Sequence, residues 1–368
     1  MAHHDVDHLL VVTDQRSGNA PQWVTGWPGT VEAFVLLRPG EPLTMSVEWY
    51  NHVPLARRIA HDVEVRWGGH RGIAGTIEEL RRRGARRVGL IGPLGPRKLR
   101  ALEVDFAVVL LDEEYVRLRQ VKSAEEIEWL RIGAALSDAG FDALLRGTRA
   151  GVGERDLANL VERAYVGRGG TTFIHYIGVT SMAQPELCVP PQFASSRRVR
   201  RGDVVFCELS ASWWDYPGQV LRTFTVDAEP TPLYRRLHEV AEAAFDAVAG
   251  VLRAGTTMAE IVSAAGVIEE AGYTICDDLL HGFGGGYLPP VLGTRSRPAG
   301  ALPELKLEEN MTVVVQPNVI TPDQKAGVQV GELLRVTKTG FERLHRAPRG
   351  LLRAGGGARG PVLPEGIV

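Results

Sequence analysis

The sequence predicts a protein of two domains: an α/β domain at the N-terminal end, followed by a larger α+β domain. Three observations support this prediction. Short apolar runs alternate with helical patterns between about residues 20 and 118, which is typical of a small α/β domain. A capping box formed by Ser123 and Glu126 starts a long helix with one apolar face. After Gly169 the pattern changes to strands and hairpins, interrupted by two helical segments.

The elements are expected in a regular order, and we place the domain boundary near Gln120. In the first domain, 1–119, strands are expected at 31–37, 63–67, 87–92 and 106–111, with helices at 49–60, 77–84 and 96–102. In the second domain, 120–346, strands are expected at 171–179, 203–211, 219–226, 311–320 and 327–337, with helices from 124, at 233–255 and at 258–272. Residues 347–368 end in a Gly- and Pro-rich stretch and are predicted to be a flexible tail.

Composition excludes several classes of function. The chain has 368 residues and a formal net charge of −2, so neither nucleic acid nor an anionic membrane is expected as a partner. No apolar run approaches the roughly 18 residues of a membrane-spanning helix, and the N-terminal residues do not resemble a signal peptide. The three cysteines have no CxxC spacing and are odd in number, which argues against a disulfide framework and favours a cytoplasmic location.

The stretch 207–224 reads as a β-hairpin with one carboxylate, Glu208, near its start. Eleven residues later stands an amide, Gln219, where a second carboxylate would complete an obvious metal site. Cys207 neighbours Glu208 on the strand, so it is expected to face the other side as a small buried residue.

Several motifs together resemble the creatinase, prolidase and aminopeptidase P family. They are the segments 23–29 (WVTGWPG), 117–131, 200–209, 222–224 (RTF), 281–286 (HGFGGG), 307–318 and 327–337. The segment 23–29 is similar to the first strand and turn of that family. The resemblance covers about residues 10–345. It implies a creatinase-like α/β N-terminal domain, an α+β catalytic domain with the pita-bread fold, and a homodimer.

The resemblance also locates the positions of a metal centre. Metallopeptidases of this family hold two divalent ions with two Asp, one His and two Glu. The positions of the two Asp are occupied here by Glu208 and Gln219, and the position of the His by His281. The positions of the two Glu are occupied by Gln316 and Gly331. One carboxylate in place of four leaves the charge of two divalent ions unbalanced, so no metal or other cofactor is expected. Glu332 is expected to point to the opposite face unless a bulge reorients it.

The catalytic histidines of the resembling enzymes are replaced as well. One falls at Pro190 or Pro191 and another at Leu288, and a creatinase carboxylate falls at Leu221. Ordinary X-Pro hydrolysis and the reaction of creatinase itself are therefore not expected from these residues.

The remaining polar residues define a predicted organic site. His281 is the predicted acid/base and Glu208 its partner, while the amides of Gln219 and Gln316 are predicted to bind substrate. Further predicted substrate-binding residues are Arg222, His175, Tyr287 and Glu332. Arg222 could instead brace strands, and His175 could be a hydrogen-bonded core histidine.

These residues predict a metal-independent, creatinase-like enzyme that acts on a small amino-acid-like or amide-containing molecule. Hydrolysis of a C–N bond is the first expectation, and elimination or isomerisation would need fewer groups. One alternative is a non-catalytic binding protein with the pita-bread fold. Another is an Xaa-Pro peptidase with a degenerate metal site.

Overall fold

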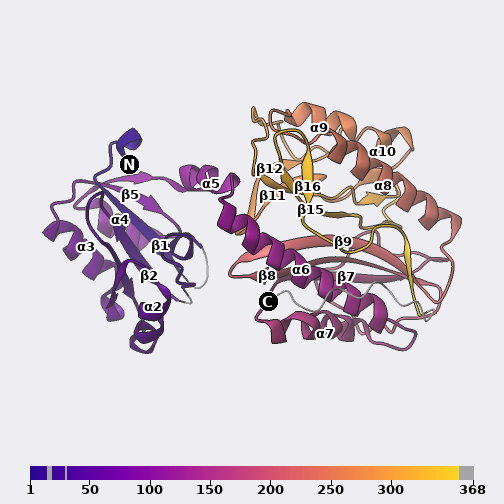
Figure 1. The fold of residues 1–368 in the computed structure, drawn as a ribbon, viewed down its shortest axis with the longest axis horizontal. Coiled ribbons are helices and arrows are strands. Elements are labelled where there is room, and N and C mark those ends of the chain that lie inside the picture. Colours follow the sequence, from indigo (N-terminus) through magenta and orange to yellow (C-terminus); the bar gives the residue numbers. More distant parts are fainter. Residues whose placement is uncertain (15–18, 30, 356–368) are drawn as a thin grey trace. The chain divides into compact units, whose positions relative to one another are not determined.

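The computed structural model describes residues 1–14, 19–29 and 31–355. It divides into two compact units, Met1–Arg119 and Gln120–Val368 (Figure 1). The first unit is α/β and the second is α+β, so the predicted fold classes are confirmed. None of the helices in the described ranges is long and apolar enough to cross a membrane.

The N-terminal unit is built on a six-stranded sheet in the order β4-β3-β2-β1-β5-β6. Its strands are β1 (His8–Thr13), β2 (Ala33–Leu37), β3 (Leu43–Val47), β4 (Val63–Trp67), β5 (Arg87–Ile91) and β6 (Ala107–Leu110). Its helices are α1 (Ala20–Thr25), α2 (Val53–Ile59), α3 (Gly72–Arg82), α4 (Pro96–Glu103) and α5 (Asp112–Gln120), the last of which reaches the unit boundary. In β1, Leu10 packs in one apolar cluster and Val11 in another, so this strand is covered on both faces.

The expectation of a strand and turn at 23–29 is wrong. Pro21 stands in the first turn of helix α1, and Gly26 ends that helix in a left-handed conformation with φ 77°. Proline is favoured at the start of a helix and glycine just past its end. The first strand of the sheet is β1, which the sequence pattern did not single out.

The second unit holds a nine-stranded sheet, in which seven strands follow the order β12-β11-β13-β15-β9-β8-β7 (Figure 1). Its strands are β7 (Thr171–Ser181), β8 (Asp203–Trp213), β9 (Tyr216–Val226), β11 (Leu280–Phe283), β12 (Tyr287–Leu292), β13 (Thr312–Val315), β15 (Gly331–Val336), β16 (Phe341–Arg343) and β17 (Leu352–Ala354). A separate two-stranded ribbon pairs β10 (Thr274–Ile275) with β14 (Val319–Ile320).

Two groups of helices cover the strands of this unit. Helices α6 (Ala124–Gly147) and α7 (Glu154–Tyr165) share an apolar cluster with β7, β8 and β9. Helices α8 (Pro232–Val251), α9 (Met258–Ala264) and α10 (Val267–Glu270) share another with β11, β13 and β15. The Ser123–Glu126 capping box forms as the sequence predicts.

The expected flexible tail at 347–368 needs correction for its first part. Leu352–Ala354 form β17, which pairs in parallel with β9. Arg349 contacts Glu242 of α8 and lies over the ring of Phe245. Backbone pairing and an ion pair hold this segment, although its composition is typical of a loop. Residues 356–368 lie outside the described residues.

Candidate functional site

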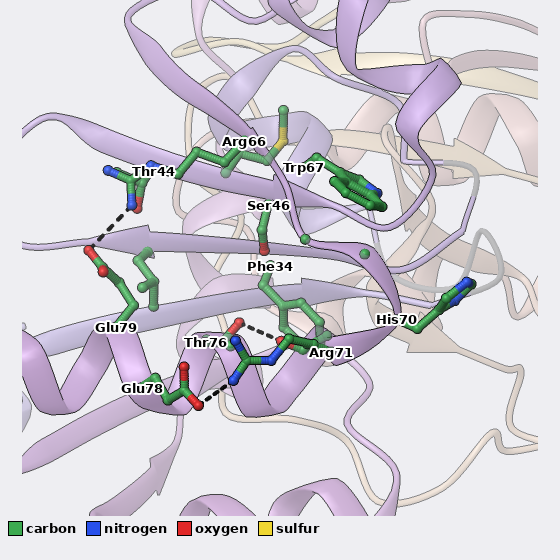
Figure 2. A pocket seen from close by; sticks show the side chains of 16 residues that line it. Phe34, Thr44, Ser46, Arg66, Trp67, His70, Arg71, Thr76, Glu78 and Glu79 are labelled. Atoms are coloured by element: carbon green, nitrogen blue, oxygen red, sulfur yellow. Dashed lines mark hydrogen bonds and ion pairs between the residues drawn. The ribbon is translucent and has the colours of Figure 1, made fainter.

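The N-terminal unit contains a cavity of about 570 Å³, lined by β3, β4, α3 and the glycine-rich segment 68–72 (Figure 2). Its charged side chains pair with one another: Arg71 with Glu78, and Arg66 with Glu79. The Thr76 hydroxyl donates to the carbonyl oxygen of Gly72. A ligand would have to compete with these pairs, so we do not assign a function to this cavity.

In the second unit, Glu208 on β8 and Gln219 on β9 lie on the same face of the sheet. The register pairs Glu208 with Leu221 and Ser210 with Gln219, which makes Glu208 and Gln219 diagonal neighbours. The Gln219 Nε2 donates to the Glu208 Oε1 over 2.6 Å. Both side chains are buried, with 7% and 1% of their surface exposed. The hairpin therefore forms a buried acid–amide pair.

Glu208 has an unusual charge state for a carboxyl group. Burial, together with the negative charges of Asp277 and Asp278, raises its pKa to about 8. Glu208 therefore holds its proton at neutral pH. A protonated carboxyl group beside a carboxamide forms a neutral pair that needs no counter-ion.

His281 reaches the same face from β11. His281 pairs with Val314, and Val314 pairs with Leu333 on β15. Leu333 lies two residues after Gly331, so both are on one face of β15, and Gly331 pairs with Leu221, the partner of Glu208. Burial lowers the pKa of His281 to about 4, so the ring is neutral at pH 7. Its Nδ1 lies 3.0 Å from the carbonyl oxygen of Gly282, which places the proton on Nδ1 and the lone pair on Nε2.

The His281 ring is held by an aromatic neighbour while its Nε2 stays available. It stacks on Tyr287 with ring centroids 4.0 Å apart and planes at 18°. Gln316 lies within reach of the ring, but Nε2 makes no hydrogen bond to the described residues. Glu208 therefore makes no hydrogen bond to this nitrogen, and its role as the partner of His281 stays a prediction.

Asp277 and Asp278 belong to the site, although the sequence did not single them out. Asp278 accepts hydrogen bonds of 2.5 Å from the Tyr287 hydroxyl and from the Gln316 Nε2. Burial and the neighbouring acid raise the pKa of Asp277 to about 6. The available signal was two consecutive acids directly before the segment LLHGF.

The family model that matches the chain is "Metallopeptidase family M24". It covers residues 128–338, more than half of the 368 residues. The chain belongs to metallopeptidase family M24. This assignment confirms the resemblance that the motifs indicated.

Relatives of this M24 protein include two proteins named Xaa-Pro dipeptidase. The one from Pyrococcus furiosus is 28% identical over 244 residues, 66% of this chain and 68% of its own length. The one from Pyrococcus horikoshii is 26% identical over 246 residues, 66% and 67% of the two chains. Both support a hydrolase of the peptidase type.

Solved structures share the fold along most of the chain. The X-Pro aminopeptidase of Thermotoga maritima superimposes with a TM-score of 0.82 at 21% identity, covering 96% of this chain and 97% of its own. The prolidase of P. furiosus superimposes with a TM-score of 0.78 at 21% identity, and the match covers 95% of this chain and 99% of the prolidase chain. These neighbours confirm the pita-bread architecture.

The M24 family implies a divalent-metal centre, and the residues of this chain do not fit one. At the last ligand position, a Cβ on Gly331 would lie 2.4 Å from the carbonyl oxygen of Val315 and 2.9 Å from the Cα of Gln316. No side chain enters there without a backbone shift. Within the described ranges, no group of three or more His, Cys, Asp or Glu side chains is placed to hold a metal ion.

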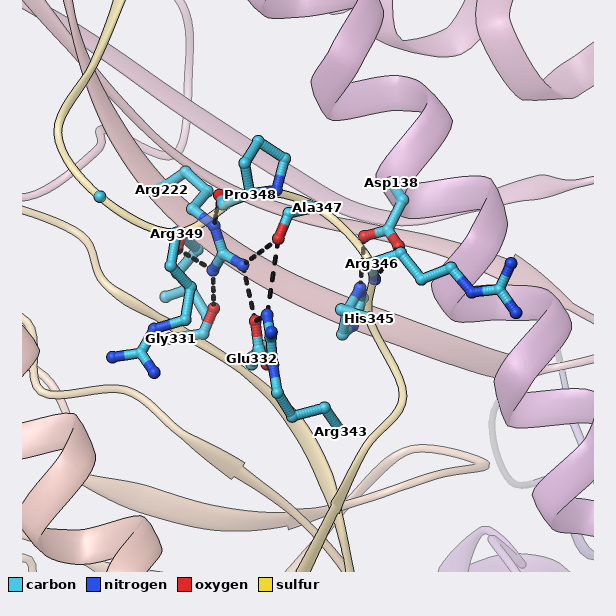
Figure 3. Close-up of polar contacts among 12 residues, drawn as sticks. Asp138, Arg222, Gly331, Glu332, Arg343, His345, Arg346, Ala347, Pro348 and Arg349 are labelled. Carbon is cyan, nitrogen blue, oxygen red and sulfur yellow. Dashed lines mark hydrogen bonds and ion pairs between the residues drawn. The ribbon is translucent and has the colours of Figure 1, made fainter. Parts of the chain in front are cut away.

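The predictions that Arg222 and Glu332 bind substrate are wrong. Arg222 pairs with Cys207, and Glu332 with Val220, so both occupy the face opposite Glu208. Their side chains form an ion pair of 2.6 Å that is 3% and 0% exposed (Figure 3). We call this ion pair, together with Arg343, which also contacts Glu332, the arginine clamp. Arg222 further donates to the carbonyl oxygens of Gly331 and Pro348, so the clamp braces strands.

The prediction for His175 is also wrong, whereas Tyr287 lies in the site. His175 pairs with Leu209 and so faces away from Glu208. Its Nε2 lies 2.7 Å from the hydroxyl of Tyr165 on α7, and burial lowers its pKa to about 4. It is a hydrogen-bonded core histidine.

Proposed function

We propose that the chain hydrolyses the C–N bond of a small amide with its own acid and base groups. The observation that supports this most is the contrast between two pKa values: about 8 for Glu208 and about 4 for His281. At neutral pH the carboxyl group holds a proton and the imidazole does not. General acid–base catalysis requires such a pair.

The proposed reaction moves two protons. The Nε2 of His281 accepts a proton from a water molecule as its oxygen bonds to the carbonyl carbon. Glu208 gives its proton to the amide nitrogen as the C–N bond breaks, which releases a carboxylic acid and an amine. Proton transfer from His281 to Glu208 through solvent then restores both groups. Asp278, held by Tyr287 and Gln316, positions the substrate.

The charge of the pocket favours a substrate that carries an ammonium group. The negative charges of Asp277 and Asp278 raise the pKa of Glu208, and the charge of Asp278 raises the pKa of Asp277, in addition to the effect of burial. A bound ammonium group would relieve this repulsion. The ring of Tyr287, 54% exposed, offers an aromatic face for the same cation.

Xaa-Pro dipeptides are the first substrates to test, because they combine an amide bond with a free ammonium group. The names of the relatives also favour a second candidate, a metal-dependent Xaa-Pro dipeptidase. In that case Glu208 and His281 would have to hold an ion with far fewer carboxylates than such ions prefer.

An assay with and without chelator separates the two candidates. Purified protein is offered Xaa-Pro dipeptides and amino-acid amides after chelator treatment, and again with Mn²⁺, Co²⁺ or Zn²⁺ added. We expect hydrolysis that the chelator does not change. We also expect kcat/KM to fall about 100-fold in Glu208→Gln and in His281→Ala, but not in Glu239→Gln, an exposed acid of α8.

Two outcomes would count against the proposal. Loss of activity with chelator and its return with metal would establish the metal-dependent candidate. Full activity in both site variants would show that another site does the chemistry.

The same catalytic groups predict a pH profile. His281 is unprotonated above about pH 4 and Glu208 is protonated below about pH 8. We therefore expect kcat/KM to be highest between these values and to fall on either side. A profile that rises steadily above pH 8 would contradict these roles.

The assembly of the chain is a separate proposal. We propose a homodimer, as the resemblance implies, in a cytoplasmic location and without nucleic-acid or membrane partners. Light scattering checks the dimer, since the chain mass is 40.1 kDa and a dimer has twice that mass.

A further inference from the structure

Strand β4, with the sequence VEVRW, stands at one end of the N-terminal sheet. It pairs in parallel with β3, and among the described residues no other strand pairs with its outer edge. Glu64, Arg66 and Trp67 are exposed on this strand. An uncovered edge strand is a template on which a further strand adds by backbone hydrogen bonds.

The backbone groups of Val65 point away from β3. The N–H of Gly68 donates to the carbonyl oxygen of Val47 on β3, and successive residues of a strand direct their backbone groups to alternate sides. The carbonyl oxygen of Val65 accepts instead from the Arg57 Nε of α2, over 3.2 Å. Arg57 is exposed, so a strand that pairs with Val65 displaces this side chain only into solvent.

The exposed charges of β4 alternate in sign. Glu64 and Arg66 lie on one face of the strand, where the Arg66 Nε and Nη2 each donate to a Glu64 oxygen over 2.8 Å. When two β4 strands run antiparallel and Val65 pairs with its own copy, Glu64 of each chain stands opposite Arg66 of the other. In such flanking pairs, which lack backbone hydrogen bonds, facing side chains come closest. The charge pattern of β4 is therefore complementary to itself.

The opposite face of the same edge carries exposed aromatic side chains. Trp67 and Tyr50 are 59% and 72% exposed, and their ring centroids lie 5.8 Å apart. Trp49, also exposed, contacts the ring of His70. Exposed clusters of large aromatic side chains are typical of protein–protein interfaces. In the antiparallel register, Trp67 stands opposite Val63 of the second chain, so both faces of β4 gain contacts.

We propose that two copies of this chain associate by antiparallel pairing of their β4 strands, centred on Val65. The two N-terminal sheets then form one continuous sheet, and every contact occurs twice about a two-fold axis. A second copy fits this edge better than an unrelated strand, because the order of Glu64 and Arg66 matches only a strand with the same order running the other way. The inference rests on the proposed homodimer and names its surface.

Charge reversal in the full-length protein tests the pairing. Glu64→Arg and Arg66→Glu each place like charges opposite one another across the two-fold axis. We expect the dissociation constant of the dimer to rise roughly 10- to 100-fold in each variant, measured by sedimentation velocity over a range of protein concentrations. The double variant Glu64→Arg/Arg66→Glu restores opposite charges at both pairs and should dimerise as the wild type does.

Mixing the two single variants gives the sharpest result. One chain then has positive charges at both positions and the other has negative charges, so an equimolar mixture should form heterodimers about as strong as the wild-type dimer. The control is Glu103→Arg, a reversal of an exposed acid on α4, which should leave the dissociation constant unchanged. Circular dichroism verifies that every variant is folded.

The outcomes separate this surface from the homodimer itself. A wild type that stays monomeric at every concentration overturns both proposals. A dimer that neither charge reversal weakens uses another surface and overturns only this inference. Single variants that associate no better when mixed than alone also overturn the β4 pairing.

Discussion

Two buried carboxyl groups of one sheet, Glu208 on β8 and Glu332 on β15, have opposite charge states, and strand β9 lies between them. Glu332 is 0% exposed and Glu208 is 7% exposed, yet the pKa of Glu332 is about 2 and that of Glu208 about 8. Burial raises the pKa of both carboxyl groups. In Glu332, however, the hydrogen bond from Arg343 and the charge of Arg222 lower the pKa by more than burial raises it. Glu208 has the amide of Gln219 and nearby acids instead.

The difference shows that the partner of a buried acid, more than its depth, decides its charge. The face with the arginine clamp carries paired charges that brace β9, β15 and the segment 343–348. The face with Glu208 keeps a proton and an imidazole lone pair available. One sheet therefore separates a structural role from the chemistry that we propose.

The largest expected effect comes from breaking the clamp. At pH 6, Glu332→Gln should lower the free energy of unfolding by roughly 3 to 5 kcal/mol, because it leaves buried arginine charge unpaired. At pH 4.5, where the folded and much of the unfolded chain hold the Glu208 proton, Glu208→Gln should change it by less than about 1 kcal/mol, because a protonated acid is replaced by an amide of the same shape. Urea unfolding followed by circular dichroism measures both. Equal losses in the two variants would contradict the contrast.

The pH dependence of stability should differ in sign for the two acids. The pKa of Glu208 is raised on folding, so the folded state binds the proton more tightly and stability falls between about pH 4.5 and 8. Relative to Glu208→Gln, the wild type should lose roughly 2 to 4 kcal/mol over this interval. Glu332 acts in the opposite sense: its contribution is present above about pH 4.5 and is lost as the pH falls towards 2. Unfolding midpoints from pH 3 to 8.5 measure both trends, and a wild type that parallels Glu208→Gln throughout would contradict the raised pKa.

Gly331, which stands at the position of the family's last metal ligand, leaves no room for a side chain, and a substitution there should have an effect of intermediate size on stability. Gly331→Ala should destabilise the protein by roughly 1 to 3 kcal/mol, because its Cβ would meet the carbonyl oxygen of Val315 at 2.4 Å. The control is Gly250→Ala on α8, where no atom lies within 4 Å of the added Cβ, and it should be neutral or stabilising by up to about 1 kcal/mol. Thermal unfolding measures both. A stable Gly331→Ala would show that a ligand side chain can be accommodated there.

The smallest effect is expected from Tyr287→Phe. The hydroxyl of Tyr287 donates to Asp278 and thereby lowers the pKa of that carboxyl. Its loss should raise the pKa of Asp278 further and change the free energy of unfolding by less than about 1 kcal/mol, since Tyr287 is exposed. A carbon NMR titration of the Asp carboxyl groups measures the shift, and an unchanged Asp278 would contradict the contact.

The fold classes and the face of Glu332 could be predicted from the sequence, because motif order and strand alternation are local properties. His175 was misplaced because its face depends on the β7–β8 register, which pairs it with Leu209 and not with Glu208. Asp278 was missed because its importance comes from contacts with Tyr287 on β12 and with Gln316 directly after β13. The segment 352–354 was predicted to be loose because composition does not reveal pairing with a distant strand.

Metal titration tests the central claim most directly, namely that the pocket holds a neutral acid–amide pair in place of a dinuclear metal centre. Chelator-treated wild type and Glu208→Gln are titrated at neutral pH with Mn²⁺, Co²⁺ and Zn²⁺ by calorimetry. We expect the two proteins to give the same heats, with no stoichiometric binding that depends on Glu208. Tight binding of two ions per chain that Glu208→Gln abolishes would contradict the claim.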